Sequence, residues 1–252
     1  MSDAPAPEVA AHREVEFFDQ FVVEHGDYDV LSERAYERLL EAFAEGVRPR
    51  PGERCIDLGC GTGAFTRRLR RFDLRLVGMD ISPGAVAHAR RETPDLEFVV
   101  GDIGATGLPD ASQDVVCYSG VLHHISSSEA RVRVLAEAHR LLTPGGRLFA
   151  YDPSAQSPSM WLYRDPRSPF FSKLGKTDNE VLLHRSQLAR ELRDAGFDQI
   201  RIRGIGGIAF RFVESKIAGV ILPLYNLYEE LLRRSPLEDR FGTFLISVAT
   251  KR

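Results

Sequence analysis

The sequence predicts an α/β fold in which a mostly parallel sheet is covered by helices on both faces. From about residue 54 to residue 152, short apolar segments alternate with amphipathic helical segments, which is typical of a parallel sheet. The stretch from Cys55 to Phe65, CIDLGCGTGAF, indicates a buried strand that breaks into a glycine-rich turn and then starts a helix. At 252 residues, the chain is long enough for one such domain with insertions.

Composition and charge exclude several classes of protein. The formal net charge is -3, and the many arginines are balanced by Asp and Glu, so the charge pattern does not indicate a nucleic-acid partner. Three cysteines, of which two fall in predicted buried strands or the turn, indicate reduced thiols and no disulfide framework. The N-terminus lacks a basic region followed by an apolar core, which argues against a secretory signal. We therefore expect a cytoplasmic protein.

The N-terminal part is expected to form a short tail and two helices. Residues 1–10 are rich in Pro and Ala, which predicts a disordered tail, and residues 11–252 are expected to form a single domain. Within it, residues 11–50 are expected to form helices that cap the site. Ser32 is the expected N-cap of the second helix and Gly46 its end, and its apolar positions recur at helical spacing: Tyr36, Leu39, Leu40 and Phe43.

The middle of the chain alternates between strands and helices. After the glycine turn, further strands are expected at residues 74–80, 96–101, 114–119 and 147–151. Ser82 and Pro83 predict the start of one helix, and Ser127 or Ser128 the start of another. Thr143-Pro-Gly-Gly predicts a turn. Because parallel strands are joined by right-handed crossovers, their carboxyl ends meet at one edge, where a ligand is expected.

The second half of the chain contains two expected insertions, residues 152–185 and residues 206–240. The first holds aromatic residues among prolines, which is typical of a lid or substrate loop. Between the insertions, a helix capped by Ser186 and a strand at residues 197–205 are expected, and the last strand is expected at residues 241–250. The apolar run between residues 213 and 234 is shorter than the roughly 20 apolar residues of a bilayer span, so it predicts a buried or interfacial helix.

The glycine turn limits the class of ligand. A dinucleotide fingerprint needs a third glycine, but Ala64 or Thr66 occupies that place in the two alternative registers. Asp57, just before the turn, would repel a pyrophosphate at close range. No Lys followed by Ser or Thr closes the turn as a P-loop requires. These features favour a ligand that carries positive charge and no phosphate.

The run DLGCGTG after a strand resembles the first motif of the class I S-adenosylmethionine-dependent methyltransferases. The resemblance covers about residues 50 to 152. It implies a Rossmann-like, seven-stranded, mostly parallel sheet and S-adenosyl-L-methionine as the cofactor. It also implies a transferase that moves a methyl group by in-line displacement to a small-molecule acceptor. The residues agree with it, because this cofactor has an ammonium and a sulfonium but no phosphate.

Candidate cofactor residues follow the strand ends. Asp80 closes the second strand roughly 20 residues after the turn, where an acid accepts hydrogen bonds from ribose hydroxyls. The resemblance implies that Asp102 contacts the adenine amino group, that Ile81 and Ile103 cover the adenine ring, and that backbone carbonyls near Ser119 face the ammonium. Two alternatives stay open: Asp102 caps the N-terminal end of the following backbone segment, and Ile81 is an ordinary core residue. The full expected set is Asp57, Gly59, Cys60, Gly61, Gly63, Asp80, Ile81, Asp102, Ile103 and Ser119.

Candidate catalytic residues follow the fourth and fifth strands. His123 or His124 is a general base for the acceptor in one hypothesis, since His titrates near neutrality, and in the other both residues are structural. Asp152 ends the fifth strand at the same edge and is expected to orient the base or the substrate. No metal is expected, because no Cys, His or carboxylate cluster shows ligand spacing along the sequence.

The acceptor is expected to lie in a capped, partly apolar pocket. Aromatic residues of the insertions and the N-terminal part are the candidates, with an ordinary lid core as the alternative: Tyr28, Trp161, Tyr163, Phe170, Phe171 and Tyr225. A rival class is a non-catalytic S-adenosylmethionine-binding or dimerisation module, in which the late apolar helix forms a homodimer surface. A nucleic-acid methyltransferase is disfavoured by the charge balance. The sequence leaves open whether oxygen, nitrogen or carbon accepts the methyl group.

Overall fold

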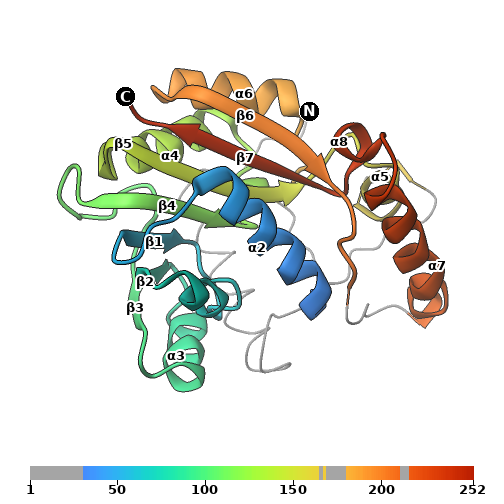
Figure 1. The fold of residues 1–252 in the computed structure, drawn as a ribbon, viewed down its shortest axis with the longest axis horizontal. Helices are drawn as coiled ribbons and strands as arrows, with labels where there is room; N and C mark the ends of the chain where they lie inside the picture. Colours follow the sequence, from blue (N-terminus) through green and yellow to red (C-terminus); the bar gives the residue numbers. More distant parts are fainter. Residues whose placement is uncertain (1–30, 165–166, 169–179, 211–215) are drawn as a thin grey trace.

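The computed structural model describes residues 31–164, 167–168, 180–210 and 216–252. They form a seven-stranded sheet in the order β3-β2-β1-β4-β5-β7-β6, in which β7 runs antiparallel to β5 and β6 and the other pairs are parallel (Figure 1). The expected seven-stranded, mostly parallel sheet is confirmed. The strands are β1 (Arg54–Leu58), β2 (Arg75–Asp80), β3 (Glu97–Val100), β4 (Gln113–Ser119), β5 (Leu142–Pro153), β6 (Asp198–Ile205) and β7 (Phe244–Thr250).

Helices cover both faces of the sheet, and strand alternation decides which residues face which layer. Cys55 and Cys117 belong to the core under α2 (Glu33–Val47), which crosses one face in Figure 1. Ile56 and Val116, the immediate neighbours of these cysteines on the same strands, belong to the core under the opposite layer. That layer contains α4 (Ser128–Leu141) and α6 (Arg185–Asp194). All three cysteines are free and buried, as expected for reduced thiols.

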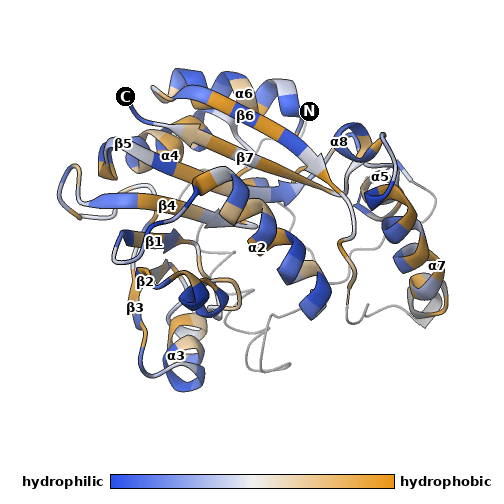
Figure 2. Ribbon diagram, viewed as in Figure 1, coloured by the Kyte–Doolittle hydropathy of each residue, from blue (hydrophilic) through white to orange (hydrophobic). Residues whose placement is uncertain are grey.

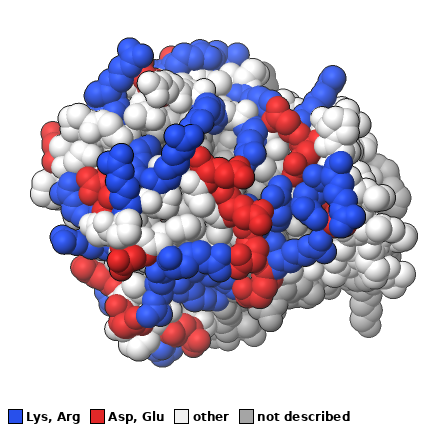
Figure 3. Space-filling view, in the orientation of Figure 1, with Lys and Arg blue, Asp and Glu red and all other residues white. Residues whose placement is uncertain are grey.

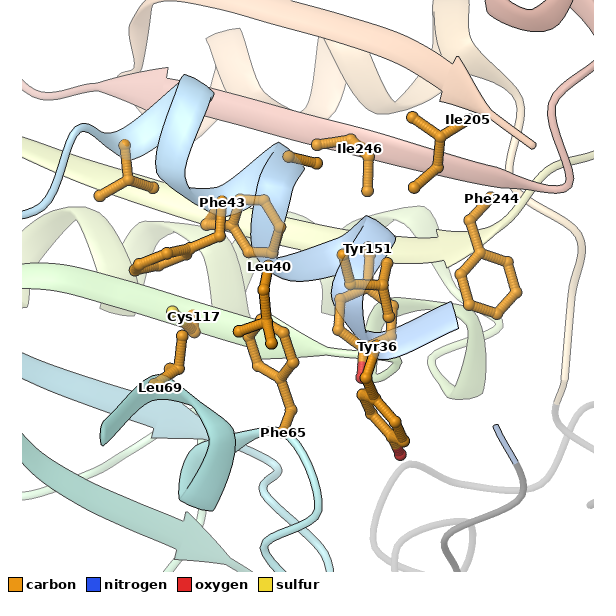
Figure 4. Close-up of a cluster of buried hydrophobic side chains, with 14 of the residues drawn as sticks. Tyr36, Leu40, Phe43, Phe65, Leu69, Cys117, Tyr151, Ile205, Phe244 and Ile246 are labelled. Carbon is orange, nitrogen blue, oxygen red and sulfur yellow. The ribbon is translucent and has the colours of Figure 1, made fainter. Parts of the chain in front are cut away.

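Helix α2 packs through an aromatic cluster. Ser32 is the N-cap, as expected, and its Oγ accepts a hydrogen bond from the Ala35 N–H. Phe43 meets Phe149 edge to face at 5.2 Å between ring centroids, and Figure 4 shows Phe43 with Leu40 and Tyr36 of the same helix in this buried cluster. The expected end at Gly46 is wrong by one residue. A Cβ at that position would lie 2.6 Å from Val248 Cγ2, so Gly46 allows the close packing of α2 on β7.

Several expected boundaries move for identifiable reasons. The helix after the glycine turn is a 3₁₀ helix, η1 (Thr66–Phe72). Strand β5 already begins at Leu142, so the expected Thr143-Pro-Gly-Gly turn lies inside it; there Gly145 N–H donates to the Lys251 carbonyl over 2.7 Å. Helix α6 begins at Arg185 with His184 as its N-cap, so Ser186 is not the cap. Helix α8 (Glu238–Phe241) delays the start of β7 to Phe244.

The remaining helices connect the strands as expected. Ser82 caps α3 (Pro83–Glu92) and Ser127 caps α4, each by accepting a hydrogen bond from a backbone N–H three residues on. The first expected insertion contains α5 (Pro158–Arg164), and the second contains α7 (Lys216–Arg233) with Pro223 inside it. Figure 2 shows apolar residues along the strands and on α7. None of the helices in the described part of the chain combines the length and apolar character needed to cross a membrane.

Candidate active site

The carboxyl ends of β1, β2, β4 and β5 meet at one edge of the sheet and bring the predicted polar residues together. Asp57 lies near the end of β1, Asp80 ends β2 and Ser119 ends β4, while Asp152 lies near the end of β5. The glycine turn follows β1 and is tied to the neighbouring strand, because Gly59 N–H and the next backbone N–H both donate to the Met79 carbonyl, over 2.7 and 3.0 Å. The turn therefore forms one wall of the site.

The glycines of the turn have different roles. All three have positive φ, at 75° for Gly59, 53° for Gly61 and 78° for Gly63. A Cβ on Gly59 would lie 2.5 Å from Val121 Cγ2, and one on Gly63 would lie 2.9 Å from the Phe98 ring, so these two glycines serve close packing. A Cβ on Gly61 would have no atom of the described residues within 4 Å, apart from its chain neighbours. On this side, Gly61 therefore has room among the described residues at the edge of the sheet.

Asp57 is a fully buried carboxyl held by two hydroxyl groups. Thr66 Oγ1 donates to its Oδ2 over 2.6 Å, and Ser119 Oγ donates to its Oδ1 over 2.9 Å. Burial raises the pKa of Asp57 to about 7, the hydroxyl donors oppose this shift, and the nearby Asp80 adds to it. A positive charge close to Asp57 would favour its ionised form. The site therefore suits a cationic group.

Asp80 links the glycine turn to the start of α3. Its Oδ2 accepts the Gly61 N–H over 2.7 Å, and its Oδ1 accepts the Ser82 N–H over 2.9 Å. Burial raises the pKa of Asp80, and these backbone hydrogen bonds lower it. Each carboxylate oxygen has a second lone pair, so Asp80 keeps acceptor capacity for hydroxyl groups.

The residues expected around adenine lie at the ends of β2 and β3. Asp102 is exposed, and its Oδ1 accepts the Gly104 N–H over 2.7 Å, so it does cap a turn. Ile81 is 37% exposed, which contradicts the core alternative for this residue, and Ile103 is half-buried. Cys60 packs with Val86, Ala89 and Phe98, so its thiol belongs to the core, and it donates a hydrogen bond to the Gly61 carbonyl of the turn over 3.7 Å.

His123 and Asp152 form a buried hydrogen-bonded dyad. Asp152 Oδ1 lies 2.9 Å from His123 Nδ1 and also accepts the His123 backbone N–H over 3.0 Å. With Nδ1–H directed at the carboxyl, the basic ring nitrogen of His123 is Nε2. Burial lowers the pKa of His123 well below its usual value, helped by the charges of His124 and Arg164, and burial raises the pKa of Asp152 well above its usual value.

His124 and Glu180 lie beside this dyad. Both histidines belong to η2 (Leu122–His124), and their ring centroids are 4.1 Å apart. Candidate ligand atoms of His123, His124 and Glu180 all lie within 4.8 Å of one another, the one such group among the residues that the structure describes. The expectation of no metal rested on sequence spacing, which does not reveal Glu180. In the structure this carboxylate forms an ion pair with Arg164.

The six residues expected to contact the acceptor differ in their exposure, and the structure does not describe all of them. Trp161 is 40% exposed on α5, whereas Tyr225 is buried and its hydroxyl donates to the Ile208 carbonyl over 3.0 Å, as in the lid-core alternative. Tyr163 lies on α5, and its side chain is not described. Three further candidates, Tyr28, Phe170 and Phe171, lie outside the described residues.

The face shown in Figure 3 carries acidic and basic side chains that are intermixed. Among the described residues, ion pairs join Arg71 with Glu37 and Arg203 with Glu45. Arg68 pairs with Glu33 and lies 3.7 Å above the centre of the Tyr36 ring. This face therefore shows no single-sign charge pattern of the kind that binds nucleic acid.

Known proteins resemble this chain in the region that builds the site. A family model described as a methyltransferase domain matches residues 56–150. The malonyl-[acyl-carrier protein] O-methyltransferase of Serratia marcescens is 30% identical over 195 residues, which are 72% of this chain and 74% of that protein. The chain belongs to the class I S-adenosylmethionine-dependent methyltransferases. Its cofactor is S-adenosyl-L-methionine.

Other relatives of this methyltransferase differ in their acceptors. The demethylmenaquinone methyltransferase of Beutenbergia cavernae is 41% identical over 122 residues, which are 48% of this chain and 49% of that protein. Among solved structures, a SAM-dependent methyltransferase from Archaeoglobus fulgidus has a TM-score of 0.62 at 18% identity, covering 93% of this chain and 100% of that chain. The [4+2]-cyclase SpnF has a TM-score of 0.64 at 19% identity, covering 100% and 98%. The fold thus does not reveal the acceptor.

Proposed function

We propose that this methyltransferase moves the methyl group to a small, partly apolar molecule by in-line displacement at the edge defined by Asp57, Asp80 and Asp152. The observation that carries the proposal is the glycine turn, where the Gly61 N–H donates to the buried Asp80 carboxyl and a Cβ on Gly61 would meet no atom of the described residues. The His123–Asp152 dyad lies at the same edge of the sheet, after β4 and near the end of β5. When bound, S-adenosyl-L-methionine supplies a methyl group activated by a sulfonium. The other catalytic contributions belong to the chain.

The cofactor side of the site is assigned by charge and hydrogen-bonding capacity. Asp57 and backbone carbonyls near Ser119 would hold the ammonium, because a buried carboxylate favours a nearby cation. Asp80 would accept the ribose hydroxyls through its remaining lone pairs. Ile81 and Ile103 would cover the adenine faces. Asp102 would accept the adenine amino group, while the other turn residues supply shape: Gly59, Cys60, Gly61 and Gly63.

The acceptor side contains the dyad. Asp152 fixes the tautomer of His123 so that Nε2 can take the proton of an acceptor hydroxyl, amine or acid. Such a base contributes about 10²–10⁴-fold, roughly 3–5 kcal/mol, whereas alignment of the acceptor contributes about 7–11 kcal/mol. Positioning is therefore the larger effect, and His123 increases the rate of an already aligned reaction. His124, beside it in η2, has the smaller role.

The acceptor is proposed to be partly apolar because the surrounding insertions supply aromatic and aliphatic side chains. Trp161 exposes part of its ring on α5. Tyr225 is buried and donates to the Ile208 carbonyl, so it would support the acceptor pocket from the core. Tyr28, Tyr163, Phe170 and Phe171 remain candidates for acceptor contacts. By their names, the relatives reported above act on malonyl-[acyl-carrier protein] and on demethylmenaquinone.

Two measurements, made one after the other, test this function. Calorimetry with S-adenosyl-L-methionine is expected to show one site per chain, and incubation with a panel of acids, phenols, amines and quinols is expected to release S-adenosylhomocysteine with one class. Tight binding with no product across the whole panel would favour the rival, a non-catalytic binding or dimerising module. Absence of cofactor binding would contradict the proposed site itself.

A further inference from the structure

The dyad is surrounded by charged or titratable groups from three elements and one connecting segment. His124 lies beside His123 in η2, Arg164 ends α5, and Glu180 lies in the segment that leads to α6. Asp152 comes from β5, and Arg131 of α4 acts electrostatically on this carboxyl. Of these groups, Arg164 and Glu180 have no place in the proposed function.

The segment that carries Glu180 is held against the dyad by its backbone. The N–H of Val181, the next residue, donates to the His123 carbonyl over 2.8 Å. Two residues later, the Leu183 N–H donates to the Pro153 carbonyl, and the Ala155 N–H donates to the Leu183 carbonyl. These two bonds form a parallel bridge between the segment and the chain that follows β5. Glu180 is thereby placed within 4.8 Å of both imidazole rings.

Arg164 of α5 pairs with Glu180. The guanidinium and the carboxylate form an ion pair, with side chains that are 23% and 9% exposed, so solvent screens this pair only partly. The charge of Arg164 also acts on His123, where it disfavours the protonated imidazole. The ion pair therefore joins α5 to the segment at Val181 and also sets the charge beside the ring.

We propose that Arg164 and Glu180 are a positioning pair for His123, which fixes the segment bonded to its carbonyl and balances the charge beside its imidazole. This inference rests on the proposed role of His123. A divalent metal on His123, His124 and Glu180 is the competing use of the same atoms. The structure favours the positioning pair, because Glu180 already bonds to a cation whose charge would repel a metal ion.

The test is a pH titration of the histidines by ¹⁵N nuclear magnetic resonance on the full chain without cofactor, with His123→Asn used to assign the His123 signals. In Arg164→Gln a positive charge is lost, so the midpoint of His123 is expected to move to higher pH. In Glu180→Gln the charge of Arg164 is no longer balanced, so the midpoint is expected to move to lower pH. The double variant and Arg164→Lys are expected to lie close to the parent.

The control is Glu53→Gln, which breaks the ion pair between Glu53 and Arg147 at the opposite edge of the sheet. The side chains of this pair are about as exposed as those of Arg164 and Glu180, and the variant is expected to leave the titration midpoint of His123 unchanged. Unchanged midpoints in both Arg164→Gln and Glu180→Gln, with thermal unfolding showing that both fold, would overturn the inference. So would calorimetric binding of one Zn²⁺ per chain that Glu180→Gln abolishes. Because the titration needs no acceptor, moved midpoints with unchanged turnover would contradict the base role of His123 and leave the pair intact.

Discussion

Asp152 Oδ1 receives two hydrogen bonds from the same residue, one from the ring Nδ1 of His123 and one from its backbone N–H. This arrangement fixes both the position and the tautomer of the imidazole. The second oxygen, Oδ2, is buried and has no hydrogen-bond partner within the described part of the chain. Burying a carboxylate oxygen without a hydrogen-bond partner is costly, and such atoms are often found at functional sites.

The first prediction concerns the two histidines. Replacing His123 with Asn is expected to lower turnover about 10²-fold, because the base is lost, and to leave the affinity for S-adenosylhomocysteine unchanged. His124→Asn is expected to have a smaller effect, since Asp152 bonds to His123. His139→Asn, in the last turn of α4 beside Phe197, is the matched control and is expected to keep full turnover. Full turnover in both His123→Asn and His124→Asn would remove the base hypothesis.

The second prediction concerns Asp57 and the cofactor. Because the pKa of Asp57 is raised to about 7 in the free protein, the carboxyl must lose a proton before it can pair with a cation. Affinity for S-adenosyl-L-methionine is therefore expected to rise with pH up to about 7–8 and then level off, with a slope of at most about tenfold per pH unit below the pKa.

Calorimetry across pH 5.5–8.5, chosen to span about one and a half units on each side of this pKa, measures the effect. Asp57→Asn is expected to bind more weakly and to lose the part of the pH dependence that belongs to this carboxyl. Parallel curves for the parent and Asp57→Asn would show that Asp57 does not face the cofactor.

The third prediction concerns Glu229, a fully buried residue of α7 that the sequence did not single out. Its carboxyl accepts hydrogen bonds from the Thr243 hydroxyl and the Ile208 N–H, and burial raises its pKa from 4.5 to about 7. The folded state therefore binds this proton more tightly than the unfolded state. The free energy of unfolding is expected to fall as pH rises between about 4.5 and 7, by up to roughly 1.4 kcal/mol per pH unit for this group.

In Glu229→Gln, the slope of the free energy of unfolding against pH is expected to lose the contribution of this one group. The amide oxygen still accepts a hydrogen bond, but the amide does not ionise. Urea unfolding at several pH values measures both slopes. The pKa of Asp57 is also raised, so Asp57 still makes stability depend on pH in Glu229→Gln. The slope of the variant is therefore compared with the slope of the parent. Identical slopes would mean that Glu229 ionises in the folded state as readily as in water.

The strands and the glycine turn were predictable because their signals are local. A buried strand, alternating glycines and an acid at the next strand end lie within one βαβ unit, and parallel topology then brings their ends together. The N-caps Ser32, Ser82 and Ser127 were predictable for the same reason, since each bonds a backbone N–H three residues away. These features position Asp57, Asp80 and the dyad.

Contacts between distant segments were not predictable. Nothing in the sequence joins Arg164 to Glu180 across an insertion, or Glu229 to Thr243 across α8. Gly46 looked like a helix end because glycine commonly ends helices, but here its lack of a Cβ serves the contact with Val248 on β7. Side-chain pairing across elements depends on packing, which a single sequence does not show.

The comparison of Gly61→Ala with Gly52→Ala tests the central claim most directly. Both glycines have positive φ, and a Cβ on either would meet no atom of the described part of the chain within 4 Å, but Gly52 lies before β1 at the opposite edge of the sheet. Both substitutions are expected to cost roughly 1–2 kcal/mol of stability. Calorimetry with S-adenosylhomocysteine is expected to show that only Gly61→Ala lowers the affinity, by about tenfold or more. Equal affinities in the two variants would contradict the placement of the cofactor against the glycine turn.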